Sequence, residues 1–131
     1  MNIVLDTNVL VSALLNPDGP PAAILNLIVT GRIGLAYDNR MLHEYLEVLH
    51  RERFGFHVES VDAIVAFFTA EGEFVTAEPA RVQFDDDGDG KSYEVMVSGE
   101  ADFLVTGNRK HFPKDRRIIN PADFLKLYRQ I

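Results

Sequence analysis

The sequence contains no cysteine among its 131 residues. This absence excludes a disulfide-stapled scaffold and any metal site built on thiolates, and it is typical of proteins kept in a reducing cytoplasm. The sequence also lacks an apolar run long enough to span a bilayer, and its first residues lack the basic start and cleavage site of a signal peptide. We therefore predict a cytoplasmic protein that does not enter a membrane.

Positive charge is also scarce, because 13 lysines and arginines face 20 acidic residues and leave a formal net charge of -7. Such a balance argues against a protein that grips nucleic acid through its overall field. The local distribution is more informative, since five basic residues lie within residues 109–117 and four aspartates within residues 85–89. An acidic cluster and a basic one fit a site that holds a cation and meets phosphate, although two solvated loops of opposite charge are an equally common explanation.

Short apolar runs alternate with helix-like segments along the sequence, which predicts a single α/β domain over residues 1–131. A hydrophobic content of 47% is sufficient for a real core. Strands are expected at residues 2–5, 33–37, 74–76, 102–105 and 117–119. Helices are expected near residues 8–15, 21–30, 40–51, 59–71, 90–99 and 121–130. This alternation predicts a parallel sheet with helices on both faces and with the C-terminal ends of all strands at one edge.

Two of the expected strands are followed directly by polar groups. The apolar residues 3–5 lead into Asp6, and the strand at 102–105 leads into Thr106 and Asn108. In parallel α/β sheets this edge is where ligands bind, and a carboxylate buried there needs a positive partner such as a metal ion. The alternative is that Asp6 only caps the helix that follows it.

Helical periodicity selects two further carboxylates. In the helix expected at residues 40–51, Glu47 lies at the centre of the polar arc, whereas Glu44 lies at its margin and can reach over the sheet edge. Asp89 stands at the start of a later helix, on the side that carries apolar residues. Those apolar residues are Tyr93, Met96 and Val97. The alternative is that Asp87 or Asp89 serves as an N-cap.

Four oxygen-bearing side chains are therefore expected to meet at one edge of the sheet: Asp6, Glu44, Asp89 and Asn108. Three carboxylates placed together repel one another unless a cation binds between them, and hard oxygen ligands suit Mg²⁺ or Mn²⁺. Residues 85–90 also match the opening of a calcium loop. Because Met96 stands where an EF-hand needs its bidentate glutamate, an EF-hand is not expected, but a looser calcium-binding loop remains an alternative.

These motifs, in this order, resemble those of the PIN-domain ribonucleases, and most closely the branch that forms the toxins of toxin–antitoxin pairs. The likeness is carried by IVLDTNVLVSA at residues 3–13, HEYLEVL at 43–49, ADFLVTGN at 101–108, KHFP at 110–113 and NPADFL at 120–125. The resemblance implies a PIN-like three-layer α/β/α fold with a central parallel sheet of about five strands. It also implies a metal-dependent endoribonuclease that uses Mg²⁺ or Mn²⁺.

Residue by residue, the resemblance places the catalytic and metal-binding carboxylates at Asp6, Glu44 and Asp89, with Asn108 at a fourth catalytic position. Many relatives carry aspartate at that fourth position. Asparagine supplies a neutral oxygen there, so a second metal ion is expected to bind more weakly. Asp87 remains an alternative to Asp89, because residues 85–90 are richer in glycine than the usual pattern of the family.

Supporting roles are expected for residues beside these four. Thr7, Asn8 and Thr106 are candidates for hydrogen bonds that orient the ligands, and Arg109 and Lys110 are candidates for RNA phosphate contacts. The expected partners are an RNA substrate, a cognate antitoxin protein and a second copy of the chain. A PIN-like module that binds RNA or protein without cleaving is the alternative to an enzyme, and a calcium-binding role is the third possibility.

Overall fold

The computed structural model describes residues 1–84 and 87–131, including their side chains except those of residues 87–89. Its strands are β1 (Asn2–Leu5), β2 (Gly34–Tyr37), β3 (Glu73–Phe74), β4 (Phe103–Val105) and β5 (Ile118–Ile119). Its α-helices are α1 (Thr7–Leu15), α2 (Pro20–Val29), α3 (Asn39–Leu49), α4 (Val58–Glu71), α5 (Asp87–Ser98) and α6 (Pro121–Tyr128). Two 3₁₀ turns, η1 (Glu52–Phe54) and η2 (Arg109–His111), complete the described part. The predicted order of strands and helices is confirmed.

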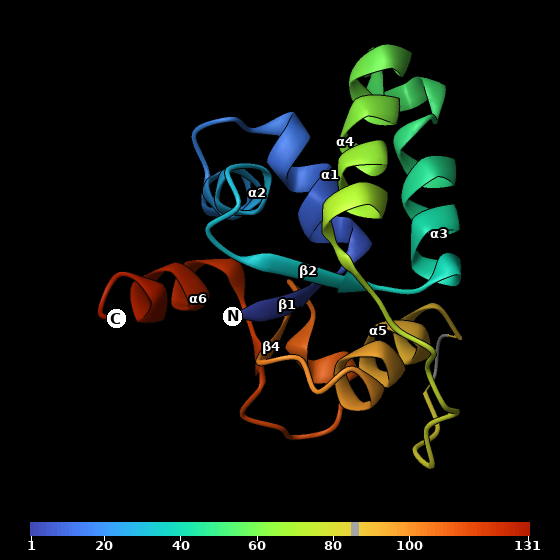
Figure 1. The fold of residues 1–131 in the computed structure, drawn as a ribbon, viewed down its shortest axis with the longest axis vertical. Coiled ribbons are helices and arrows are strands. Elements are labelled where there is room, and N and C mark those ends of the chain that lie inside the picture. The colour runs from blue at the N-terminus through green and yellow to red at the C-terminus, as the bar shows by residue number, and fades with distance from the viewer. Residues whose placement is uncertain (85–86) are drawn as a thin grey trace.

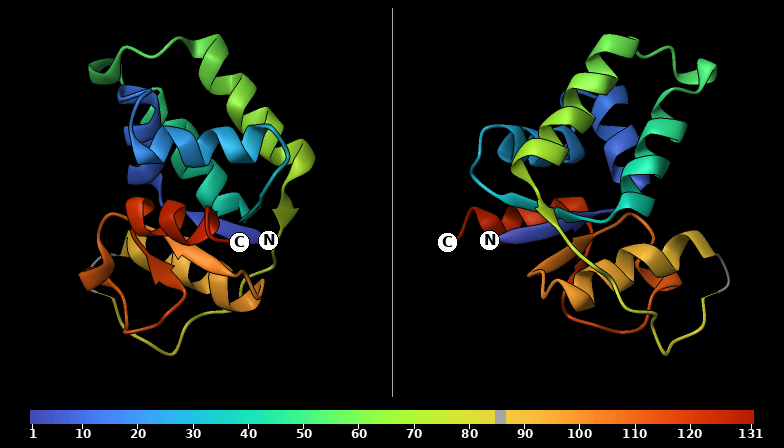
Figure 2. Two further views of the ribbon diagram at one scale, coloured as in Figure 1. Left: turned by 90° about the vertical axis from the view of Figure 1, so that its left-hand side faces the viewer. Right: turned by 45° about the vertical axis from the view of Figure 1, so that its right-hand side comes forward.

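The five strands form one parallel sheet in the order β3-β2-β1-β4-β5 (Figure 1). The first strand, β1, lies at the centre, and its residues Ile3 and Leu5 are in register with Phe103 and Val105 of β4. Figure 2 shows α1 to α4 together on one side of the sheet and α5 on the other, which makes three layers. The expected three-layer α/β/α fold with a central parallel sheet of five strands is confirmed.

The central strand is apolar because both of its faces are covered. Ile3, Val4 and Leu5 have no exposed surface, and α5 packs against β1, β2 and β4 from the side opposite α1. A strand buried on both faces needs a continuous apolar run instead of an alternating pattern. The interpretation of residues 3–5 as such a strand is confirmed.

Most element boundaries differ from the predicted ones by one to three residues, for reasons that lie in local hydrogen bonds. The second strand begins one residue later than predicted. The Ile33 amide donates to the Leu27 carbonyl of α2 at 3.2 Å, so Ile33 is part of the turn that follows this helix. The α5 helix begins earlier than expected, at Asp87. Its buried residues include Val95 and Met96, whereas Val97, which was placed on its buried side, is 44% exposed.

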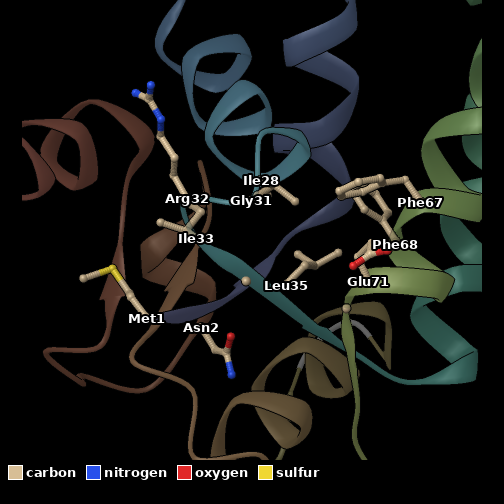
Figure 3. Close-up of a pocket in the computed structure, with 12 residues that line it drawn as sticks. Met1, Asn2, Ile28, Gly31, Arg32, Ile33, Leu35, Phe67, Phe68 and Glu71 are labelled. Atoms are coloured by element: carbon tan, nitrogen blue, oxygen red, sulfur yellow. The ribbon is translucent and has the colours of Figure 1, made fainter.

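A cavity of about 320 Å³ lies at the opposite edge of the sheet, where the strands begin (Figure 3). Ile28, Leu35 and Phe68 line it, with Arg32 and Glu71 among its polar residues. This cavity is separate from the edge that carries the predicted carboxylates. None of the helices in the described part of the chain has the length and apolar character needed to cross a bilayer.

Candidate active site

The C-terminal ends of β1 and β4 lie side by side and bring their polar residues together. The Asp6 amide donates to the Val105 carbonyl at 3.0 Å, which extends the pairing of the two strands by one residue. The Thr106 hydroxyl then donates to Asp6 Oδ2 at 2.7 Å. Asp6 is only 8% exposed and Thr106 is fully buried. The two strand tips therefore meet as predicted.

Asp6 occupies the N-cap position of α1, but its carboxylate is used elsewhere. The Val9 amide donates to the Asp6 carbonyl at 3.0 Å, and the backbone of Asp6 is extended as in other N-caps. Within the described residues, however, the Asp6 side chain makes no capping hydrogen bond to the first turn. The capping alternative thus accounts for the backbone conformation of Asp6 but not for the position of its buried carboxylate.

Glu44 contacts Thr7, the first residue of α1 and the residue that follows Asp6. The Thr7 hydroxyl donates to Glu44 Oε2, and Lys91 Nζ lies 3.0 Å from Glu44 Oε1. The Glu44 side chain is 31% exposed, whereas Glu47 is 55% exposed and pairs with Arg51 at 2.8 Å. The choice of Glu44 over Glu47 from helical periodicity agrees with this placement.

A buried tyrosine forms the floor below these carboxylates. The Tyr45 hydroxyl donates to the Leu5 carbonyl at 2.5 Å, and the side chain has no exposed surface. Burial raises the pKa of Tyr45 well above its usual value, and the negative charges of Asp6, Glu44 and Asp38 raise it further. Three carboxylates are therefore close enough to act on one hydroxyl.

Asp38 is a carboxylate of this edge that sequence reasoning missed. It follows β2 as Asp6 follows β1, and it is 6% exposed. Its side chain caps α3 by accepting from the Met41 amide at 3.0 Å, and it also accepts from Arg40 Nε at 2.7 Å. The signal was present, because the apolar end of β2 runs into an aspartate. Its hydrogen bonds identify it as a cap that fixes the start of α3.

Arg40 joins this cap to α5. Its Nη1 lies 2.8 Å from Glu94 Oε1, and Glu94 Oε2 accepts from the Ala80 amide at 2.7 Å. Burial acts to raise the pKa of Glu94, but the hydrogen bonds from Ala80 and Arg40 outweigh it and hold that pKa below its usual value. The network ties α3, α5 and the segment before α5 together around the candidate site.

On the other side of Asp6, the Thr106 hydroxyl also accepts from the Asn108 amide at 3.1 Å. Asn108 is half-buried three residues after the end of β4, and its backbone amide is linked to Asp6 through the Thr106 hydroxyl. Asn8, which was expected to orient a ligand, is exposed on α1. Of the three residues predicted to support the carboxylates, Thr7 and Thr106 make direct hydrogen bonds to them.

Asp89 and its alternative Asp87 lie in the first turn of α5, but their side chains are outside the described residues. The same holds for much of the calcium-loop alternative, which includes residues 85 and 86. Lys91, two positions after Asp89, is described and reaches Glu44. Its role had no signal in the sequence, because nothing in helical periodicity couples residues 44 and 91.

The basic residues Arg109 and Lys110 lie in η2 and are exposed. With Lys114 they line a surface cavity of about 450 Å³, which is formed by residues between β4 and the start of β5. Phe112, in contrast, is 8% exposed, and its ring lies 6.0 Å from that of Phe84. The two aromatic side chains therefore belong to the core or pack against it, whereas the exposed cationic side chains face solvent, where an anion can reach them.

The oxygen-rich set fits a hard divalent cation in its chemistry. Asp6 and Glu44 present carboxylates near the Tyr45 hydroxyl, whose pKa is raised by burial and further by their charges. Among the described residues no three histidine, aspartate or glutamate side chains are arranged to hold a metal ion. The third predicted ligand, Asp89, falls where side chains are not described. Asp6 and Glu44 each accept from a threonine hydroxyl at this edge, and their role as metal ligands stays a prediction.

The comparison with known families agrees with this geometry. No curated protein matches the chain. The model of the PIN domain family matches residues 2–110, a range that includes every residue of the site from Asp6 to Lys110. Because this match covers most of the sequence, the chain belongs to the PIN domain family.

Proposed function

We propose that the protein is a divalent-metal-dependent endoribonuclease. PIN domains are typically nucleases, and they typically use a divalent metal ion. The observation that carries the proposal is that Asp6 and Glu44 both act on the buried Tyr45 hydroxyl at this edge of the sheet, and each accepts a hydrogen bond from a threonine hydroxyl. Two ordered carboxylates at this edge are the arrangement that hard cations and phosphate chemistry require.

In this mechanism Asp6, Glu44 and Asp89 would hold Mg²⁺ or Mn²⁺. When bound, the ion would supply an activated water for in-line attack on a phosphodiester and positive charge to offset that of the phosphate oxygens. Thr106 fixes the orientation of Asp6, and Thr7 fixes that of Glu44. Asn108 orients water or metal by its neutral oxygen.

Arg109 and Lys110 complete the mechanism as contacts to RNA phosphates. Both are exposed in η2, four and five residues after the end of β4 at Val105. Their position lets them bind the backbone of an RNA strand whose scissile phosphate lies at Asp6. The net charge of -7 makes this local pair more important for RNA binding than the overall field.

The test is cleavage of single-stranded RNA with Mg²⁺ or Mn²⁺ by the wild type and by Asp6→Asn. Asparagine keeps an oxygen for the Thr106 hydroxyl but removes the charge, so we expect cleavage to fall by roughly 100-fold or more. Asp18→Asn is the matched control, because Asp18 is exposed before α2 and far from this edge. Equal cleavage by the wild type and Asp6→Asn, across several RNAs and both metals, contradicts the proposal.

A non-catalytic module that binds RNA or protein is the second candidate. The neutral Asn108 and the pairing of Glu44 with Lys91 favour it, because both lower the negative charge offered to a cation. RNA binding without cleavage, unaffected by Asp6→Asn, supports this reading. Stabilisation of the protein by Ca²⁺ but not by Mn²⁺ supports the calcium alternative instead.

We also propose that the protein acts in the cytoplasm as the toxin of a toxin–antitoxin pair, with an antitoxin protein as partner and with a second copy in a homodimer. Leu15 and Val29 support a protein contact, since they are 56% and 38% exposed on neighbouring helices.

Induced expression should arrest growth, and Asp6→Asn should relieve the arrest. A short neighbouring reading frame whose product also relieves it is the expected antitoxin; normal growth without that product contradicts the toxin role.

A further inference from the structure

Lys91 places a positive charge inside the candidate metal site. Its Nζ lies 3.0 Å from Glu44 Oε1, and only 16% of its side chain is exposed. The residue comes from α5, so the contact crosses from one face of the sheet to α3 on the other side. A lysine held this closely is part of the site, unlike a solvated surface lysine.

Both oxygens of Glu44 are already engaged in this state. Oε2 accepts from the Thr7 hydroxyl, and Oε1 faces the Lys91 ammonium. A neutral hydroxyl leaves its acceptor able to bind a cation as well, whereas an ammonium repels a second cation at the same atom. Glu44 Oε1 is therefore the atom at which the Lys91 ammonium and a metal ion would exclude each other.

Arg40 borders the same surface but is committed elsewhere. Its guanidinium pairs with Asp38 at 2.7 Å and with Glu94 at 2.8 Å. Lys91 is different because its charged partner is one of the predicted metal ligands. A cavity of about 630 Å³, lined by Glu44, Glu47 and Lys91 among others, gives the ammonium room to move away.

We propose that Lys91 is a positioning residue that competes with the divalent cation for Glu44 and thereby lowers the metal affinity of the site. This inference rests on the proposed metal-dependent function. In the metal-free protein the ammonium holds Glu44 in place, and metal binding through Oε1 requires its displacement into the neighbouring cavity. The site is therefore kept ordered without metal, at the expense of tight metal binding.

The experiment is calorimetric titration of the full chain with Mn²⁺ in the absence of RNA. Lys91→Met removes the charge and keeps the length of the side chain, so we expect Mn²⁺ to bind roughly ten-fold more tightly than to the wild type. Lys91→Arg keeps the charge and should bind within about two-fold of the wild type. Lys126→Met, at an exposed position of α6, changes the net charge by the same amount, and its Mn²⁺ affinity should also stay within about two-fold of the wild type.

Glu44→Gln tests whether the effect passes through Glu44. Adding Lys91→Met to Glu44→Gln should leave the Mn²⁺ affinity within about two-fold of that of Glu44→Gln alone, because residue 44 then carries no charge for which Lys91 and Mn²⁺ compete. If the double variant gains as much affinity as Lys91→Met alone, the lysine acts only through general charge and the proposal is wrong. Lys91→Gln should reproduce the gain if Lys91→Met does not fold.

The outcomes separate this inference from the function on which it rests. Mn²⁺ binding to the wild type that Asp6→Asn abolishes, with Lys91→Met and Lys91→Gln no tighter than the wild type, overturns the competition and leaves the metal site. The absence of Mn²⁺ binding in the wild type and in both Lys91 variants overturns the competition together with the metal-dependent function. Thermal unfolding without metal confirms that each variant is folded.

Discussion

At the scale of single residues, hydroxyl groups order the acidic edge, and those of Thr106 and Tyr45 have different roles. The Thr106 hydroxyl donates to Asp6 and accepts from the Asn108 amide, so it orders a carboxylate and the start of the following turn together. The Tyr45 hydroxyl lies beneath and supports the Leu5 carbonyl. Each hydroxyl can be removed with little change of shape, which makes their roles separable by mutation.

Thr106→Val is expected to lower RNA cleavage by about 10- to 100-fold, as is usual when a hydrogen bond that orients a metal ligand is lost. The substitution keeps the volume of the buried side chain but leaves Asp6 without this donor. Thr106→Ser retains the hydroxyl and should stay close to the wild type in initial-rate assays. Equal rates for the valine and serine variants contradict an orienting role.

Tyr45→Phe is expected to lower the free energy of unfolding by about 1–3 kcal/mol, because the buried Leu5 carbonyl loses a hydrogen bond. Urea denaturation measures this difference. Tyr128→Phe is the matched control, since the ring of Tyr128 can keep its stacking on Phe124, and it should change stability by less than about 0.5 kcal/mol. A Tyr45→Phe protein as stable as the control refutes the supporting role.

At the scale of elements, the start of α3 sets where Glu44 lies. Asp38 directly follows β2 and caps α3, so one residue fixes the position of the helix against the sheet edge. Glu44 stands five residues after the first helical residue, Asn39, within less than two turns of that cap. A loosened first turn therefore moves Glu44.

Asp38→Ala is expected to cost about 1–2 kcal/mol of stability and to reduce cleavage, because the cap and one of the two acidic partners of Arg40 are lost together. Asp38→Asn keeps the capping oxygen and should cost less than Asp38→Ala. Thermal denaturation and initial rates on RNA provide the two measurements. If alanine and asparagine are equally destabilising, the contribution comes from the charge next to Arg40 and not from the cap.

The elements were predictable where a local pattern determines them. The apolar residues 3–5 fixed β1, and the arc of α3 fixed Glu44 at the margin, because both patterns repeat within a few residues. Asp38 was missed although its setting at a strand tip matches that of Asp6. The Lys91–Glu44 pair was not predictable, since it depends on how α5 and α3 approach across the sheet edge.

At the scale of the whole molecule, charge and acidity act on the network that ties the two faces together. Glu94 joins α5 to Arg40 of α3 and to the Ala80 amide, and its pKa is held below the usual 4.5. A carboxyl group whose pKa is lower in the folded state adds stability above the unfolded pKa and loses it as the pH falls through the folded pKa. Acid therefore weakens this link.

Glu94→Gln should consequently be less stable than the wild type near neutral pH, and the difference should shrink as the pH falls below about 4.5. Thermal melting of both proteins between about pH 7 and about pH 3.5 measures this change. Glu59→Gln, at an exposed position in the first turn of α4, should show a much smaller difference that varies less with pH. A constant gap between Glu94→Gln and the wild type rules out the contribution of the Glu94 charge.

The central place of β1 in the sheet also has a consequence for synthesis. This strand leaves the ribosome well before its partner β4, which lies about a hundred residues later, with Leu5 opposite Val105. Pairings so distant along the chain are slow to form and become possible only after β4 has been synthesised. A chain that stops before β4 therefore lacks the assembled acidic edge, because the Thr106 hydroxyl that donates to Asp6 has not yet been made.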